Sequence, residues 1–385
     1  MADEFLPFSR PTISPEAIDE VVACLRSGWI TTGPRVKKFE EAIAAYVGAP
    51  RVLALSSATA GLHLALTALG LEPGDEVITT PMTFAATLNM IVLAGGRPVL
   101  VDVEPDTYNM DVGQIAAAIS TRTRAILPVH FAGLPVDMDP LYALAEKHGL
   151  RVIEDAAHAI GTEYRGKRIG GFGDTQVFSF HPNKNITTGE GGAVVTRDQK
   201  LADSIALLRF HGMDREAWNR FGKSGNQHYE IITPGFKYNM MDMQAALGLH
   251  QLPALDGFIR RRTEIAARYQ EILAGWPQWT LPRTPDYPHR HAWHLYAPLI
   301  NPAEAHMDRD AFMQAMKERN IGTGLHYRAV HLYPYYRDQF GFKRGDFPNA
   351  ESISDRIVSL PLFPGLSDSD QDRVIAAMAE LFGQD

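Results

Sequence analysis

The sequence lacks three features that would each point to a particular class of protein. It has one cysteine, Cys24, among 385 residues, so no disulfide can form within the chain, as is typical of a reducing compartment. No apolar run approaches the ~18 residues of a membrane-spanning helix. The first residues, "MADEFLPFSRP", include acidic side chains and no apolar signal region. We therefore expect a cytoplasmic protein without membrane insertion.

Positive charge is also scarce. Lys and Arg total 37 against 45 Asp and Glu, which gives a net charge of −8, and no basic block stands out, so we expect no nucleic-acid partner. Hydrophobic residues make up 45% of the chain and charged residues 21%, as in ordinary globular enzymes. A chain of this length can form a large domain and a smaller one.

Short apolar segments alternate with helical patterns through the first half of the chain. This alternation predicts βαβ crossovers and a mainly parallel sheet with helices on both faces. The expected strands lie near Glu76–Thr80, Val99–Val103, Ala125–Val129 and Val152–Asp155.

The pattern changes after about Lys200. We expect a long charged helix after residue 250, strands over residues 291–300 and near 322–327, and helices near 308–319 and 369–382. The prediction is an α/β protein with a large domain over residues 1–250, which includes the N-terminal segment. Residues 251–385 are expected to form a linker helix and a small α+β domain.

Three groups of polar residues lie where strands are expected to end. "SSATAG" at 56–61 leads into a helix N-terminus, which attracts anions; Glu154 and Asp155 end one strand; and Lys184 lies in "SFHPNKNITTGEGG" after the next. Singly, these are an ordinary helix cap, a satisfied carboxylate and a surface lysine. Together they match the groups that hold the phosphate, ring nitrogen and aldehyde of pyridoxal phosphate.

These stretches resemble a known family along nearly the whole chain. With "SGWITTGP" (27–34), "LLRFHGM", "GFKYNMMDMQAALG" and "SLPLFPGLS", they are similar to the DegT/DnrJ/EryC1/StrS sugar aminotransferases. The resemblance implies the pyridoxal-phosphate-dependent transferase fold of type I, which is aspartate-aminotransferase-like and has a mainly parallel seven-stranded sheet.

Three further stretches resemble one branch of that family. They are "EFLPFSRP" at 4–11, "HAWHLY" at 291–296 and "IGTGLHYRAVH" at 321–331. The branch contains the UDP-4-amino-4-deoxy-L-arabinose–oxoglutarate aminotransferases.

The resemblance implies a role for each matching residue. Lys184 would bind the cofactor aldehyde and then act as acid and base in proton transfer, and Asp155 would pair with the pyridine nitrogen. The active unit would be a homodimer with sites at the subunit interface. The other implied cofactor contacts are the Ala58 and Thr59 amides and the Ser179 hydroxyl at the phosphate, Phe84 on the ring, His158 at the phenolic oxygen, and Asn239 at the neighbouring subunit's phosphate.

The substrate contacts leave alternatives open. Trp29 and Thr31 fit either plain turn chemistry or a sugar-nucleotide contact. His326 and Tyr327 fit either an edge strand with a packed histidine or a site lining.

Two other groups of side chains are candidates, one for binding a substrate carboxylate and one for binding a metal. Arg209 and Arg328 could hold the second carboxylate of the amino donor, because planar guanidinium groups suit carboxylates. We expect no metal at His289, His291 and His294, because alternation along a strand would place the third histidine on the opposite face.

The resemblance implies transfer of the amino group of L-glutamate to a UDP-linked 4-keto pentose. The products would be UDP-4-amino-4-deoxy-L-arabinose and 2-oxoglutarate, a step that in bacteria feeds lipid A modification of lipopolysaccharide and resistance to cationic antibiotic peptides. One alternative is a family enzyme for another nucleotide-linked keto sugar. Another is a sugar dehydratase. One branch of these dehydratases has a histidine in place of the lysine, and Lys184 argues against that branch. A third is a non-catalytic sugar-nucleotide sensor or scaffold on this fold.

Overall fold

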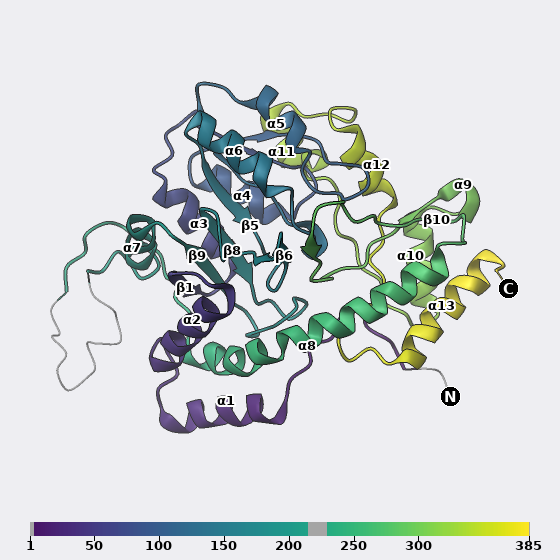
Figure 1. Ribbon diagram of the computed structural model, residues 1–385, viewed down its shortest axis with the longest axis horizontal. Coiled ribbons are helices and arrows are strands. Elements are labelled where there is room, and N and C mark those ends of the chain that lie inside the picture. The colour runs from purple at the N-terminus through teal and green to yellow at the C-terminus, as the bar shows by residue number, and fades with distance from the viewer. Residues whose placement is uncertain (1–3, 215–228, 385) are drawn as a thin grey trace.

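A seven-stranded sheet forms the centre of the computed structural model, which describes residues 4–214 and 229–384 (Figure 1). The strand order is β1-β9-β8-β5-β4-β2-β3. Neighbours from β8 to β3 pair in parallel, whereas β9 is antiparallel to both β8 and β1. The predicted mainly parallel seven-stranded sheet is confirmed. Its strands are β1 (Arg51–Leu55), β2 (Glu76–Thr79), β3 (Arg97–Leu100), β4 (Thr123–Ile126), β5 (Arg151–Asp155), β8 (Thr175–Ser179) and β9 (Gly192–Thr196).

Helices cover both faces of this sheet. Side chains alternate along each strand, so that Val152 of β5 belongs to one apolar core and Ile153 to the other. The Ile153 core includes residues of α3 (Ala58–Ala68), α4 (Ala85–Leu93) and α7 (Gln199–Leu208). The Val152 core includes residues of α2 (Pro34–Val47), α5 (Val112–Ala118), α6 (Met138–His148) and α8 (Asp242–Leu273), and α1 (Pro15–Ser27) packs outside against α8.

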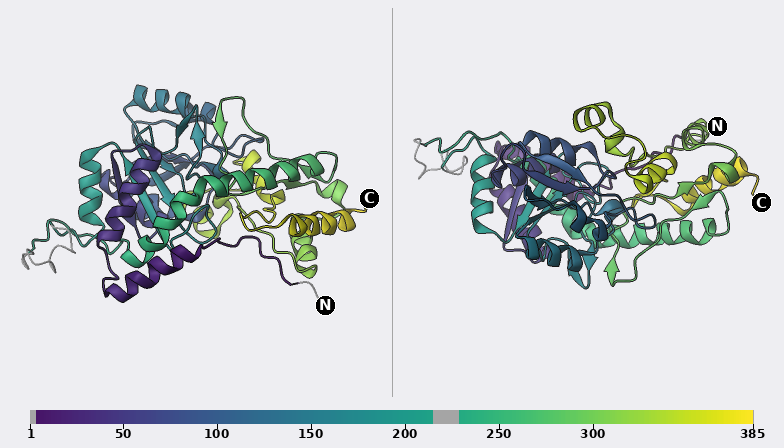
Figure 2. Two further views of the ribbon diagram at one scale, coloured as in Figure 1. Left: turned by 60° about the horizontal axis from the view of Figure 1, so that its bottom comes forward. Right: turned by 90° about the horizontal axis from the view of Figure 1, so that it is seen from above.

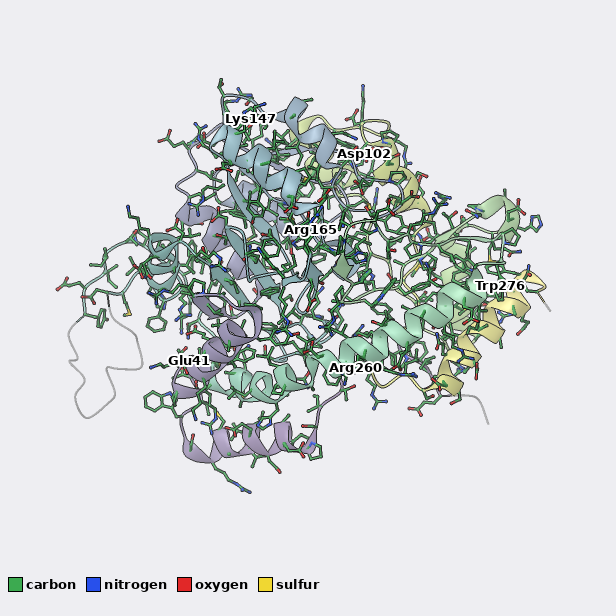
Figure 3. The ribbon with its side chains drawn as sticks, viewed as in Figure 1. Glu41, Asp102, Lys147, Arg165, Arg260 and Trp276 are labelled. Carbon is green, nitrogen blue, oxygen red and sulfur yellow. The ribbon has the colours of Figure 1, made fainter. Side chains whose placement is uncertain are left out.

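The long helix α8 passes from this region into a third hydrophobic core, the C-terminal core. Ile259 packs in the core of the large sheet, whereas Ile265 packs with Trp279, Phe312 and Met378. Figure 2 shows the C-terminal elements extending from one side of the sheet region, and Figure 3 marks Arg260 on α8 and Trp276 just beyond its end. The elements here include α9 (Pro302–Ala305), α10 (Arg309–Glu318) and α13 (Asp368–Phe382), with β10 (Trp279–Thr280) paired to β12 (Leu299–Ile300).

The remaining elements are short strands and helices. β11 (His289–Arg290) pairs with β6 (Glu163–Tyr164), which pairs with β7 (Lys167–Arg168). Thus a strand from the C-terminal part is added to a hairpin of the large-sheet region. The short helices are η1 (Phe131–Gly133), η3 (Val330–Leu332), α11 (Pro334–Phe340) and α12 (Pro348–Arg356).

The expected strand over residues 291–300 is wrong. Only β12, at its end, is a strand, because Trp293 has a positive φ of 46° that interrupts the extended backbone. The amides of Ala292 and His294 donate to the carbonyls of Gly133 and Ala132 instead of a strand partner. The expected strand near 322–327 is reduced to one bridge between Gly324 and Ser359. The helices expected near 308–319 and 369–382 are confirmed as α10 and α13.

The division into domains at residue 250 stays a proposal, since α8 runs continuously through that position. Within the described ranges, none of the helices combines the length and the apolar character needed to cross a bilayer.

Candidate active site

A cavity of about 300 Å³ lies beyond the carboxyl ends of β1, β5 and β8. Ligands of open α/β sheets bind at this edge because loops there leave a crevice between neighbouring strands. The structure brings nine of the predicted site residues to this cavity. They are Ala58, Thr59, Phe84, Asp155, His158, Ser179, Lys184, His326 and Tyr327.

The N-terminus of α3 forms one end of the cavity. The Ser57 hydroxyl caps the helix by accepting the Ala60 amide at 3.0 Å. The amides of Ala58 and Thr59 have no hydrogen-bond acceptor within residues 4–214 and 229–384. Gly192 lets β9 approach this turn, because a Cβ there would lie 2.5 Å from the Ala58 nitrogen. Two free N–H groups at a helix N-terminus suit a phosphate.

Asp155 faces the cavity from the end of β5. Its Oδ2 accepts the Thr87 hydroxyl at 2.8 Å and its Oδ1 accepts the Ala157 amide at 3.1 Å. Burial raises the pKa of Asp155, while the two hydrogen bonds and the Lys184 charge act in the opposite direction. A buried carboxyl group that faces a cavity can pair with a protonated ring nitrogen.

Lys184 lies in the loop between β8 and β9. A turn closed by the Lys184 amide and the His181 carbonyl carries it, and the residue is half-buried. Loss of hydration around the amine lowers the pKa of Lys184 to about 8, against the attraction of Asp155. An amine with such a pKa is partly unprotonated near neutral pH and can attack a carbonyl.

Aromatic side chains and a neutral histidine lie around the cavity. Phe84 caps α4 with 62% of its surface exposed, and its ring centre lies 6.0 Å from that of Tyr327. His158 accepts the Ala132 amide on Nδ1 at 3.2 Å, so its Nε2–H donates to the Tyr327 hydroxyl at 2.9 Å. Burial holds the pKa of His158 well below its usual value. The Phe84 ring is accessible to stack on a flat ligand.

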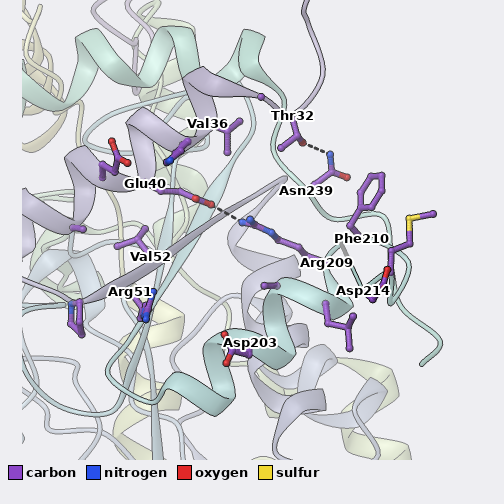
Figure 4. Close-up of a pocket in the computed structure, with 18 residues that line it drawn as sticks. Thr32, Val36, Glu40, Arg51, Val52, Asp203, Arg209, Phe210, Asp214 and Asn239 are labelled. Atoms are coloured by element: carbon purple, nitrogen blue, oxygen red, sulfur yellow. Dashed lines mark hydrogen bonds and ion pairs between the residues drawn. The ribbon is translucent and has the colours of Figure 1, made fainter. Parts of the chain in front are cut away.

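Two predicted residues line a different pocket, of about 460 Å³, between α2, β1 and α7 (Figure 4). Arg209 donates to the Glu40 carboxylate at 2.6 Å and to the Ala54 carbonyl at 3.1 Å. The Asn239 amide donates to the Thr32 hydroxyl at 2.6 Å. Arg209 is therefore occupied by Glu40 and does not line the Lys184 cavity.

The other predicted contacts also lie away from this cavity. The Trp29 indole donates to the Thr32 carbonyl at 3.1 Å, and the Thr31 carbonyl accepts the Asp242 amide at 3.0 Å. The first bond closes the loop on itself, and the second ties it to the start of α8. The Arg328 guanidinium donates to the Leu332 carbonyl at 3.2 Å.

Sequence reasoning missed Thr87 and His294. Thr87 lies in the first turn of α4, three residues after Phe84, so helical spacing could have placed it beside the site. The Nε2 atom of His294 lies 3.5 Å from the Lys184 amine. No local pattern indicated this contact. The side on which His294 lies was predicted from strand alternation, and the backbone turn at Trp293 means that no strand forms there.

The three histidines of "HRHAWH" have separate environments. His289 Nδ1 lies 2.9 Å from the Tyr287 carbonyl, and His291 accepts the Trp293 amide. In the part of the chain that the structure describes, there is no cluster of three or more His, Cys, Asp or Glu residues suited to a metal ion.

The residues present fit pyridoxal phosphate. The unpaired amides at α3 suit its phosphate, the buried Asp155 suits its ring nitrogen, and the Lys184 amine suits its aldehyde. All three groups line one cavity of a size within the usual range for small ligands.

Comparison with known proteins gives the same result. The family model of the DegT/DnrJ/EryC1/StrS aminotransferases matches residues 11–379. The spore coat polysaccharide biosynthesis protein SpsC of Bacillus subtilis is 48% identical over 98% of this chain and 97% of its own.

Solved structures of sugar aminotransferases share the whole fold. Spr1654 of Streptococcus pneumoniae, assigned as a sugar aminotransferase and solved in its PMP form, has a TM-score of 0.91 at 33% identity, over 98% of this chain and 99% of its own. Its PLP form has a TM-score of 0.90. PseC of Helicobacter pylori, an aminotransferase of pseudoaminic acid biosynthesis, has a TM-score of 0.90 at 32% identity over the full length of both chains. The chain therefore belongs to the DegT/DnrJ/EryC1/StrS aminotransferase family and is a pyridoxal-phosphate-dependent sugar aminotransferase.

Proposed function

We propose that Lys184 and Asp155 are the catalytic residues of this aminotransferase. One observation carries the proposal: the two side chains enter the same cavity from the ends of the neighbouring strands β8 and β5. Lys184 Nζ would bind the aldehyde of the cofactor, and the Asp155 carboxylate would keep its ring nitrogen protonated. When bound there, pyridoxal phosphate supplies an electron sink for the charge that remains when a carbon loses its proton.

Lys184 would also move that proton. Because its pKa is lowered to about 8, the amine exists in both protonation states near neutral pH. This property suits a group that takes a proton at Nζ from one carbon and delivers it to another.

The other cavity residues would hold and orient the cofactor. The Ala58 and Thr59 amides and the Ser179 hydroxyl would bind the phosphate, and Phe84 would cover the ring. The neutral His158, with its Nε2–H directed at Tyr327, would lie beside the phenolic oxygen. The family and the free amides at α3 support these assignments.

As substrates we propose L-glutamate and a UDP-linked 4-keto pentose, with UDP-4-amino-4-deoxy-L-arabinose and 2-oxoglutarate as products. The support is the resemblance of three stretches to the arabinose branch, and in that case the product would serve lipid A modification. Much of these stretches is framework: Leu6, Tyr296 and Ile321 are buried in the C-terminal core. Similarity at buried residues indicates a shared fold more than a shared acceptor sugar.

A different nucleotide-linked keto sugar is the second candidate. It is favoured by the relatives, whose names point to spore coat polysaccharide and pseudoaminic acid biosynthesis. His326 and Tyr327 line the cavity and are the side chains that we propose contact the sugar in either case.

A panel of UDP- and dTDP-linked keto sugars tests the substrate. Each sugar is incubated with holoenzyme and L-glutamate, and products are identified by mass. We expect the keto oxygen of the UDP-linked pentose to be replaced by an amino group while 2-oxoglutarate accumulates. Transfer to another sugar alone would contradict the pentose assignment, and loss of water without amine gain would identify a dehydratase.

We also propose a homodimer in which Asn239 reaches the phosphate site of the neighbouring subunit. In one chain Asn239 lines the second pocket and not the Lys184 cavity, so a partner copy is required for this contact. Trp29 and Thr31, on the adjoining loop, would then lie near the partner's sugar nucleotide.

We also propose a cytoplasmic location, which the single free cysteine, Cys24, supports.

Mixing two inactive variants tests the shared site. Lys184→Ala and Asn239→Ala proteins are each assayed alone and after subunit exchange. A mixed dimer would carry both defects in one site and neither in the other, so we expect activity to return. A mixture that stays inactive, despite exchange shown by mass spectrometry, would place Asn239 in its own subunit's site.

A further inference from the structure

A second imidazole contacts Lys184 from the protein side. His294 Nε2 lies 3.5 Å from Lys184 Nζ, at the outer limit of a hydrogen bond, and 2% of His294 is exposed. The residue does not belong to the cavity lining. His294 therefore touches the amine without occupying the space of a ligand.

The His294 ring differs from its neighbour His158 in one respect. The two ring centres lie 4.3 Å apart. The Ala132 amide fixes the proton of His158 on Nε2, whereas Nδ1 of His294 is buried without any hydrogen-bond partner in the described residues. Because nothing holds the His294 tautomer, its Nε2 can accept from a Lys184 N–H or donate to the amine lone pair. An unpaired buried nitrogen costs stability and calls for an explanation.

Burial keeps this ring uncharged, and positive groups on two sides add to the effect. Arg262, 1% exposed, donates from Nη1 to the carbonyls of His294 and Trp293, both at 3.2 Å, and of Leu362 at 2.9 Å. Lys184 lies on the other side. Burial, followed by Lys184, His158, Arg262 and His326, holds the pKa of His294 well below its usual value. The bonds to Trp293 and His294 anchor the backbone that carries the ring.

We propose that His294 is a positioning residue that holds the free Lys184 amine at the base of the cavity. This inference rests on the proposed role of Lys184. A lysine side chain is long and flexible, and its amine must stay within reach of the reacting atoms whenever it is not covalently bound. An uncharged imidazole on an anchored backbone can hold it without repelling an ammonium.

The test compares two ligands of the apoenzyme. Pyridoxal phosphate reports capture of its aldehyde by Lys184. Absorbance and borohydride trapping measure this capture. Pyridoxamine phosphate has no aldehyde and reports the phosphate and ring contacts alone. For His294→Phe we expect capture about tenfold slower, equivalent to about 1.4 kcal/mol, with unchanged affinity for pyridoxamine phosphate. His294→Gln, whose amide oxygen can accept a hydrogen bond, should recover most of the rate.

His291→Phe is the matched control. His291 lies in the same segment but stacks on Trp293, with ring centres 3.8 Å apart, and its Nδ1 accepts the Trp293 amide. This variant should capture pyridoxal phosphate at the wild-type rate. If His294→Phe binds pyridoxamine phosphate poorly, His294→Met, which is flexible and lacks a strong acceptor, takes its place.

The outcomes separate this inference from the proposed function. Wild-type capture by His294→Phe, together with no capture by Lys184→Ala, would overturn the role of His294 and leave Lys184 in place. Capture and transfer by Lys184→Ala would instead overturn the proposed role of Lys184.

Discussion

The last two residues of β5 carry carboxyl groups that serve opposite faces of the sheet. Glu154 faces α6, where its Oε1 accepts the Tyr142 hydroxyl and the Gln176 amide, each at 2.5 Å, and its Oε2 lies 2.8 Å from His130 Nε2. Asp155 faces the α3 side and lines the cavity. Strand alternation alone separates them.

The difference lies in what fills the acceptor positions of each carboxyl group. Protein donors surround Glu154, which is fully buried. Asp155 receives the Thr87 hydroxyl and the Ala157 amide and still borders open space. A carboxyl group saturated by the protein stabilises the fold, whereas one with an open side can bind a ligand.

The largest expected effect on the cavity face comes from Lys184→Ala. Transfer should fall by at least about 10³-fold, as when other covalent nucleophiles are removed, because no amine remains to bind the aldehyde or carry the proton. Glutamate-dependent amination, measured by mass, checks this. Thermal unfolding should match the wild type, and full turnover by the folded variant would remove Lys184 from the mechanism.

Asp155→Ala should rank second. Cofactor binding should weaken, and the rate at saturating cofactor should fall by about 10²–10³-fold, the usual cost of losing one electrostatic group that acts in the transition state. Titration with pyridoxal phosphate and a rate at saturation separate the two effects. An unchanged rate would mean that the cavity face of β5 is as structural as the other face.

Glu154→Leu should have the opposite effect to Asp155→Ala: it should lower stability and leave the rate unchanged. It leaves the His130 and Tyr142 donors without an acceptor, and Gln176 Nε2 keeps only the Phe172 carbonyl, so the free energy of unfolding should fall by about 3 kcal/mol. Denaturant unfolding measures this loss, and kcat of the folded protein should not change. A fall in kcat without loss of stability would erase the distinction between the two faces.

The smallest expected effect is a pH dependence on the cavity face. With the pKa of Lys184 lowered to about 8, its reaction with an amine-directed reagent in the apoenzyme should level off above pH 8. Below that pH it should fall about tenfold per unit, as the ammonium form takes over. Nα-acetyl-lysine, whose side-chain amine has a pKa of about 10.4, is the control and should still gain reactivity up to pH 10. Parallel profiles would show that the cavity does not perturb this amine.

Much of the fold could be predicted from local patterns. Apolar runs alternating with helical stretches predicted the mainly parallel sheet, and the C-terminal helices α10 and α13 appear where expected. The strand expected over residues 291–300 failed because its hydrogen-bond partners are residues 132–133 and the backbone turns at Trp293. Composition and alternation carry no information on such a partner.

The candidate site divides in the same way. Arg209 looked available for a carboxylate, but Glu40, which lies 169 positions away in the sequence, binds it. His294 was considered only as a metal ligand and was placed on the face opposite His289 and His291, yet it contacts Lys184 across 110 positions. Sequence reasoning identified the residue types and could not identify their partners.

By itself, the sequence determined most strands of the large sheet, the helices α10 and α13, and that Ser57, Asp155 and Lys184 lie at or just beyond strand ends, because periodicity, capping and turns are local properties of the chain. Only the tertiary structure decided that His294 reaches Lys184 and that Glu40 occupies Arg209. Those contacts depend on how segments more than a hundred residues apart pack together, which short-range patterns do not encode.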